Sequence, residues 1–173
     1  MNPEELAREA VKIEREILGE PGGKQDQYMA AYGDINLMKF ISDNTVDVKK
    51  VISHDKSIRR IEDSLLLLYT GKERNSADIH RDQIGNSANM VDVYDEMRDL
   101  AEHAFRAICN GDVDALGELM HRNWTLKKTL SGKISDQWID GKYSRAIELG
   151  ARGAGCGCRR RRVHTPRCRS GEA

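Results

Sequence analysis

The residues most suited to chemistry stand together in the run Pro21-Gly-Gly-Lys-Gln-Asp-Gln-Tyr28. A single carboxylate, Asp26, lies between two glutamines, shortly after a Gly-Gly pair and a lysine. Glycine adopts backbone angles that side chains forbid, so a ligand can approach the chain closely at Gly22 and Gly23. Lys24 and the glutamines add hydrogen-bond donors around the carboxylate. The combination predicts an acid/base or phosphate site, and a polar loop that caps a helix is the alternative that spacing leaves open.

The sequence around this run resembles the catalytic segment of the GHMP kinases, the small-molecule kinases of galactose, homoserine, mevalonate and phosphomevalonate. The similar stretch extends from Glu14 to Gly33. Its Gly-Lys-Gln-Asp-Gln-Tyr version is most similar to the sugar-kinase branch that includes the heptose 7-phosphate kinases. Further matches follow in order at residues 67–71, 74–76, 123–128 and 134–151. The resemblance covers residues 3–153 and implies a kinase.

The resemblance also implies roles for individual residues. Phosphoryl transfer needs an in-line geometry, a cation on the phosphates and often a carboxylate that orients or deprotonates the attacking hydroxyl. By resemblance, Asp26 is that carboxylate. The substrate-binding residues that the resemblance implies are Gly22, Gly23, Lys24, Gln25 and Tyr28. For Lys24, a solvated surface lysine is an equally open interpretation.

Glu14 is the candidate metal ligand. In many members of the family a Glu-Arg pair precedes the Gly-Asp motif, and its Glu helps to hold Mg²⁺, a cation that prefers carboxylates, waters and phosphate oxygens. The chain has one more residue between Glu14 and Asp26 than the mevalonate-kinase-like pattern. An exposed helix carboxylate that pairs with Arg15 or Lys12 is the alternative interpretation of Glu14.

Two parts of the family pattern are missing from the sequence. The first is the loop of the form Pro-x-x-x-Gly-Leu-Gly-Ser-Ser, whose backbone N–H groups surround the phosphates of ATP. The second is a glycine-rich segment, Gly-Ala-Gly-Gly-Gly-Gly-Phe in close relatives, in whose place the chain has four consecutive arginines at 159–162. A shift of reading frame predicts this replacement, since codons such as CGG CGG CGG AGG become GGC GGC GGA GGG when read from the next nucleotide. We therefore expect residues 154–173 to be a basic tail that is disordered or out of frame.

The tail has two other interpretations. An arginine run binds nucleic acid through its phosphates, but the tail has no aromatic residue that could stack on bases. A zinc site could gather Cys156, Cys158, His164 and Cys168, although the Cys-x-Cys spacing differs from the usual Cys-x₂-Cys. An RNA-binding arm is therefore the less expected function, and a zinc site less expected still.

Composition places the chain among globular proteins, with 39% hydrophobic and 32% charged residues and a net charge of zero. The charge is uneven, because residues 152–173 contain seven arginines and one glutamate. The only cysteine before the tail is Cys109, which suits a reducing compartment. No apolar run approaches the roughly 18 residues of a membrane helix, and the acidic N-terminus lacks the order of a secretory signal. We expect a cytoplasmic protein that binds no membrane.

The predicted elements place the candidate site between two helices. Asn2, Pro3 and two glutamates begin a helix that Gly19 ends, and a second helix covers residues 25–32 up to Gly33. Residues 35–40, 46–53 and 64–70 are predicted strands, the last one buried because it contains four consecutive leucines. Apolar stripes then predict a long helix that Gly111-Asp112 breaks, a second helix to residue 130, and a third that Ser135 caps. Trp124 is expected in the core, and the histidines at 54, 80, 103 and 121 on helix faces or the surface.

This is an α+β pattern with its strands in the first half. The resemblance assigns residues 1–71 to the end of the N-terminal α/β lobe of a GHMP kinase and residues 72–153 to the helices of an incomplete, ferredoxin-like C-terminal lobe.

The resemblance implies an enzyme that uses ATP and Mg²⁺ to phosphorylate a hydroxyl of a sugar or sugar phosphate. Without the phosphate loop, this chain is expected to be weakly active or inactive. The alternative is a non-catalytic remnant or an RNA-binding module. Apolar surface that would cover missing strands predicts self-association.

Overall fold

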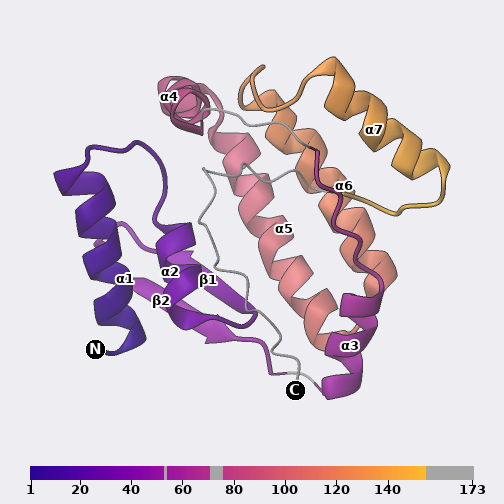
Figure 1. Cartoon of the computed structure of the whole chain (residues 1–173), viewed down its shortest axis with the longest axis horizontal. Helices are drawn as coiled ribbons and strands as arrows, with labels where there is room; N and C mark the ends of the chain where they lie inside the picture. Colours follow the sequence, from indigo (N-terminus) through magenta and orange to yellow (C-terminus); the bar gives the residue numbers. More distant parts are fainter. Residues whose placement is uncertain (53, 71–75, 155–173) are drawn as a thin grey trace, which may run out of the picture.

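The computed structural model describes residues 1–52, 54–70 and 76–154, which form a mostly helical α+β fold with a small sheet (Figure 1). Its elements follow in the order α1 (Pro3–Lys12), the π-helical segment η1 (Ile13–Ile17), α2 (Gln25–Tyr32), β1 (Asn36–Phe40), β2 (Val46–Lys50), α3 (Asp55–Asp63), α4 (Ser76–Asn86), the 3₁₀ turn η2 (Ser87–Asn89), α5 (Val91–Asn110), α6 (Val113–Thr129) and α7 (Gln137–Glu148). α1, α2 and the sheet lie on one side of α5 in Figure 1, and α6 and α7 lie on the other.

The first helix begins where its sequence predicts. The Asn2 side chain accepts a hydrogen bond of 2.8 Å from the backbone N–H of Glu5, and the Glu5 carboxylate accepts one of 2.9 Å from the N–H of Asn2. This reciprocal pair satisfies two donors that a helix start otherwise leaves without partners. The predicted stops at Gly19 and Gly33 are also confirmed, since both glycines follow the ends of their helices.

A β-hairpin joins the two sides of the molecule. β1 and β2 pair antiparallel, with Met38 opposite Val48, and form the two-stranded sheet. The Phe40 ring packs edge-on against Tyr28 of α2, with their centroids 5.7 Å apart. Lys39 of the same strand makes a 2.7 Å ion pair with Glu102 of α5. The hairpin therefore holds the α1–α2 pair beside the long helix α5.

The helical half has two apolar clusters. One contains the buried Trp124 together with Leu130, Ile134, Ile139 and Ile79, as the sequence predicts for Trp124. The other joins α3, α5 and α6 through Ile61, Ala107 and Leu116. α5 and α6 are separate because Gly111 has a φ of +66°, which side chains rarely adopt. Asp112 then caps α6 by accepting a 3.1 Å hydrogen bond from the N–H of Ala115.

Two predictions about elements are wrong. Residues 64–70 form no strand: α3 ends at Asp63, and Leu65 to Tyr69 continue as exposed coil, with Leu67 97% exposed. A strand needs a neighbouring strand for its backbone hydrogen bonds, and the described residues provide none here. The cap of the last helix is Asp136, which accepts from the N–H of Ile139 at 2.8 Å, while Ser135 donates to Asp140 instead.

The remaining predictions about the fold stand as follows. The α+β class is confirmed, and the predicted strands at 35–40 and 46–53 correspond to β1 and β2, although Ser53 lies outside the described residues. Helices α3 and α4 were not predicted. The division into two kinase lobes at Gly71 stays a prediction, because Gly71 lies outside the described residues, as does the tail from residue 155 onward.

Candidate active site between helices α1 and α2

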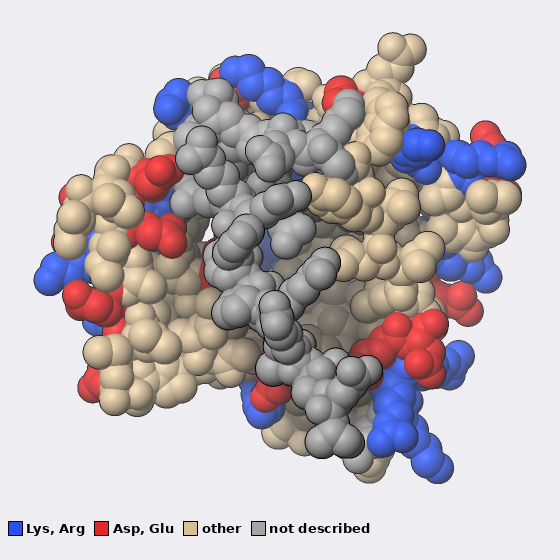
Figure 2. Space-filling model, in the orientation of Figure 1, with Lys and Arg blue, Asp and Glu red and all other residues tan. Residues whose placement is uncertain are grey.

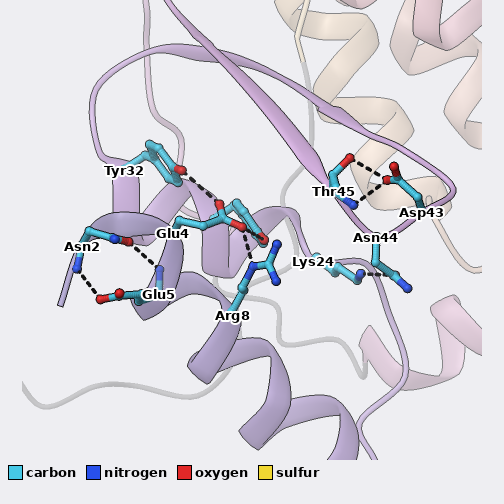
Figure 3. Close-up of polar contacts among 10 residues, drawn as sticks. Asn2, Glu4, Glu5, Arg8, Lys24, Tyr32, Asp43, Asn44 and Thr45 are labelled. Atoms are coloured by element: carbon cyan, nitrogen blue, oxygen red, sulfur yellow. Dashed lines mark hydrogen bonds and ion pairs between the residues drawn. The ribbon is translucent and has the colours of Figure 1, made fainter.

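One glutamate fixes the packing of α2 on α1. Glu4 accepts hydrogen bonds from the hydroxyls of Tyr28 at 3.0 Å and Tyr32 at 3.1 Å, and from the Nε of Arg8 at 2.6 Å. Figure 3 shows Tyr32 and Arg8 pointing toward the Glu4 carboxylate. Tyr28 and Tyr32 lie one helical turn apart on α2 and stack with their ring centroids 6.2 Å apart. Glu4 therefore fixes both the distance and the rotation of α2 relative to α1.

The same cluster shifts the titration of its members. The hydrogen bond from Arg8 is the main cause that lowers the pKa of Glu4 below its usual 4.5. Burial first, and then the hydrogen bond to Glu4, raises the pKa of the Tyr28 and Tyr32 hydroxyls above their usual 10.0. Each shift favours an ionised carboxylate that accepts from two neutral tyrosines, which is the arrangement that joins the helices.

A second hydrogen bond joins the helices next to Asp26. The Nε2 of Gln27 donates to the Oε2 of Glu14 at 2.6 Å, and Gln27 is only 8% exposed. Glu14 lies in η1 and is half-buried, whereas Asp26 precedes Gln27 in the first turn of α2 and is exposed. Within the described part of the chain the Asp26 side chain has no hydrogen-bond or ion-pair partner. The Asp26 carboxylate is therefore free to bind a ligand. The next residue, Gln27, is hydrogen-bonded to Glu14.

Arg15 holds the loop between η1 and α2. Its guanidinium donates to the carbonyl oxygen of Glu20 at 2.6 Å and also to that of Gly23. Gly22 has a φ of +140°, and a Cβ there would lie 2.9 Å from the Nη2 of Arg15. The loop therefore wraps around the guanidinium, and only glycine fits at position 22.

The other predicted substrate residues lie around the start of α2. Lys24 donates to the Oδ1 of Asn44 at 2.6 Å, as Figure 3 shows, so its ammonium is held toward the turn between β1 and β2. Gln25 is exposed at the first position of α2, and Gly23 is exposed in the loop. Tyr28 is buried, with 2% exposure, and its hydroxyl is occupied by Glu4.

A groove of about 1000 Å³ runs along α1 toward Lys24. Its lining mixes the basic side chains Arg8, Lys12, Arg15 and Lys24 with the acidic Glu5, Glu9 and Glu16. The sequence-predicted residues are thus divided between surfaces: Lys24 and Tyr28 line this groove, while Gly22 and Gly23 line a separate pocket of about 270 Å³ against α4.

Sequence reasoning missed three residues that organise the site. Glu4 was read only as part of the helix start, Arg15 only as a partner for Glu14, and Gln27 only as a nearby donor. The contacts of Glu4 and Gln27 join residues 24 and 13 positions apart, so no local periodicity could reveal them. The Gly-Gly pair could have indicated the role of Arg15. A tight glycine turn can point its backbone carbonyl groups inward, and these need a hydrogen-bond donor such as an arginine.

The part of the chain that the structure describes holds no group of three or more His, Cys, Asp or Glu side chains arranged to bind a metal. Mg²⁺ sites commonly use only one or two carboxylates together with waters and substrate phosphates, so the assignment of Glu14 as a metal ligand stays a prediction. The possible zinc ligands of the tail lie outside the described residues. No helix among the described residues is long and apolar enough to cross a membrane.

Comparison with known proteins finds sugar kinases that are similar to this chain. No protein-family model matches the chain. It is 30% identical over 161 residues to the D-glycero-alpha-D-manno-heptose 7-phosphate kinase of Campylobacter jejuni, a match that covers 88% of this chain and 47% of that protein. It is 25% identical over 151 residues to the bifunctional fucokinase/GDP-fucose pyrophosphorylase of Arabidopsis thaliana, covering 79% of this chain and 14% of that protein.

The fold agrees with the sequence matches. A crystal structure of a D-glycero-D-manno-heptose 1-phosphate kinase from Bacteriodes thetaiotaomicron superimposes with a TM-score of 0.67 at 24% identity, over 90% of this chain and 42% of that one. The chain thus spans about half the length of the heptose kinases that it matches. Over that part, the chain is related in sequence to the D-glycero-manno-heptose phosphate kinases, which are GHMP-type sugar kinases.

Proposed function

We propose that this chain carries the sugar-activating part of an ATP- and Mg²⁺-dependent kinase, which transfers the γ-phosphate of ATP to a hydroxyl of a heptose phosphate or a similar sugar. Asp26 is the carboxylate that orients and deprotonates the hydroxyl. Glu14 is the Mg²⁺ ligand. Gly22, Gly23, Lys24, Gln25 and Tyr28 form or support the substrate loop.

The observation that carries the proposal is the partly buried hydrogen bond between Gln27 and Glu14. It joins the carboxylate assigned to the metal to the residue that follows Asp26, so the two carboxylates belong to the same pair of packed helical segments. Phosphoryl transfer depends chiefly on such positioning and on electrostatic stabilisation, because the protein has little covalent chemistry to do. The exposed Asp26 carboxylate, without a partner among the described residues, is available to accept a proton.

The residues of this chain would act as follows. The substrate hydroxyl donates a hydrogen bond to the Asp26 carboxylate, which takes the proton as the oxygen attacks the γ-phosphorus. Glu14 supplies a hard oxygen ligand for the cation, and Gln27 keeps that carboxylate in place. ATP would supply the phosphoryl group and ADP would leave.

The 173 residues do not include the loop that binds the phosphates of ATP in the family pattern. The groove along α1 mixes acidic with basic side chains. We therefore assign the binding of the ATP phosphates to a loop outside these residues.

A phosphotransfer assay tests the proposal. The protein is extended with the glycine-serine loop and with the glycine-rich segment in the shifted frame, and is given Mg-ATP and D-glycero-D-manno-heptose 7-phosphate. We expect ADP and a heptose bisphosphate in equal amounts, and the Glu14→Gln variant should need more Mg²⁺ for half-maximal rate. Sequencing the surrounding genomic DNA gives the extension that the assay uses. Absence of sugar-dependent ADP formation by the folded, extended protein would reject the proposal.

The alternative, a module that binds RNA through the arginine-rich tail, depends on residues outside those described. The described side chains on the face in Figure 2 mix lysines and arginines with aspartates and glutamates. Nucleic-acid surfaces instead gather basic side chains on one face. On that face, the mixed charge of the described side chains gives the RNA-binding function no support beyond the tail itself.

A further inference from the structure

A pocket of about 270 Å³ lies between the Gly22–Gly23 turn and the helical half of the molecule. Its other walls come from α4, η2 and α5, through His80, Gln83, Ser87 and Tyr94. Sequence reasoning treated His80 as an ordinary helix-face histidine. The volume is near the lower end of the roughly 300–1,000 Å³ typical of small-molecule sites.

The turn is closely fitted to this pocket. A Cβ at Gly22 would lie 3.2 Å from the Cδ2 of His80 on one side and 2.9 Å from the Arg15 guanidinium on the other. Arg15 of η1 holds the carbonyls of Glu20 and Gly23, so the turn keeps its shape where it meets His80. His80 of α4 therefore lies close to the loop that leads into Asp26.

The chemistry of the lining selects a neutral, polyhydroxylated ligand. Among the described residues that form the pocket, none is Asp, Glu, Lys or Arg. The side chains of His80, Gln83 and Tyr94 have no hydrogen-bond partner in the described part of the chain, and Ser87 donates to the Ile84 carbonyl at 2.8 Å and keeps its acceptor capacity. Imidazole, amide and hydroxyl groups can each donate to or accept from a sugar hydroxyl. The charged side chains line the other groove, along α1.

We propose that this pocket binds the hydroxyl groups of the sugar substrate, with His80 and Gln83 as the residues that determine specificity and Tyr94 as a surface for the apolar face of the ligand. The proposal rests on the proposed sugar-kinase function and adds α4 and α5 to the substrate site. His80 and Gln83 are half-buried, and a ligand that covers them without offering a hydrogen-bond partner is disfavoured, so these side chains select for hydroxyl positions.

Titration followed by NMR tests the proposal on the 173-residue chain without ATP. The probes are D-glycero-D-manno-heptose 7-phosphate, the unphosphorylated heptose and inorganic phosphate. We expect both sugars to shift the ring resonances of His80, and phosphate alone to leave them unchanged. His80→Ala and Gln83→Ala should each weaken sugar binding about 3- to 10-fold, as expected for one lost hydrogen bond, and His80→Gln should recover part of the loss.

The control is His103→Ala, which removes an exposed histidine from α5 outside the pocket, and amide spectra establish that each variant is folded. Sugar binding that is unchanged in both folded pocket variants, or shifts caused equally by phosphate alone, would overturn the proposal. No sugar binding by the folded chain would overturn it as well. The proposed kinase function is judged separately, since sugar-dependent ADP formation by the extended protein does not require this pocket to be the hydroxyl site.

Discussion

At the scale of single residues, the site depends on a few side chains that hold others in place. Glu4 fixes α2, Gln27 fixes Glu14, and Arg15 fixes the glycine turn. None of these three is the carboxylate that we assign to proton transfer. Asp26 remains exposed while the residues around it are anchored, as expected where a reactive group must meet a ligand and its support must not move.

Glu4→Gln should weaken the α1–α2 contact and change how stability depends on pH. The pKa of Glu4 lies below 4.5 in the folded protein, so its stabilisation is fully present above that pH and is lost as the pH falls through the folded value. We expect a loss of about 1–2 kcal/mol at pH 7 from the charge-assisted hydrogen bonds. Below pH 4.5 the wild-type and variant curves should converge.

The measurement is urea unfolding between pH 3 and 7. Glu9→Gln is the matched control, because Glu9 lies exposed on the same helix. Equal stability of the Glu4 and Glu9 variants at every pH would contradict the role of Glu4.

Gly22→Ala should destabilise the fold, because the new Cβ meets Arg15 and His80 at a φ of +140°. A strained backbone of this kind costs roughly 1–3 kcal/mol, which for a chain of this size lowers the Tm by about 3–10 °C. Gly23→Ala is the control, since a Cβ there has nothing within 4 Å. Thermal unfolding by circular dichroism compares the two, and identical Tm values would show that the turn is not packed as described.

At the scale of elements, the sequence predicted correctly those helix ends that depend on contacts between residues close in the chain. The Asn2 cap, the Gly111-Asp112 break and the start of α2 follow from contacts within a few residues. The leucine run at 65–68 misled the prediction because a strand depends on a partner strand that local sequence does not specify. The sequence pattern indicated only the segment around Asp26 as a candidate site. It did not indicate Glu4, Gln27 or His80, because Glu4 and Gln27 make contacts between separate helices and His80 lies on α4, far from Asp26 in the sequence.

The exposed segment Leu65–Tyr69 should drive self-association. Its five apolar residues are each between 57% and 97% exposed, and each leucine that becomes buried contributes about 1.5–3 kcal/mol. Sedimentation velocity should show concentration-dependent oligomers of the wild-type chain and a shift toward monomer in Leu66→Lys/Leu67→Lys. Leu149→Lys, which changes an exposed leucine beyond α7, should leave association unchanged. A wild-type chain that stays monomeric at every concentration would contradict this prediction.

At the scale of the whole molecule, the chain corresponds to about half of the heptose kinases that it matches. The matched half contains the Asp26 loop and the helices around it, and the sequence has no glycine-serine phosphate loop. We therefore propose that these residues activate the sugar hydroxyl and that a loop outside them binds the phosphates of ATP.

Binding of Mg-ATP to the 173-residue chain should accordingly be weak or undetectable by calorimetric titration. Backbone N–H groups around the phosphates are the main source of nucleotide affinity in such a loop, and without them both affinity and transition-state stabilisation are lost. Micromolar affinity for Mg-ATP would show that these residues hold a phosphate site of their own.

The most direct test of the account is the turnover number of Asp26→Asn in the extended, active protein. Asparagine keeps the size and hydrogen bonding of the side chain but cannot accept the proton. General-base catalysis contributes on the order of 10²–10⁴-fold, so kcat should fall by about that factor while the affinity for ATP stays nearly unchanged. A variant that retains full kcat would leave Asp26 a structural carboxylate at the start of α2 and would contradict the account.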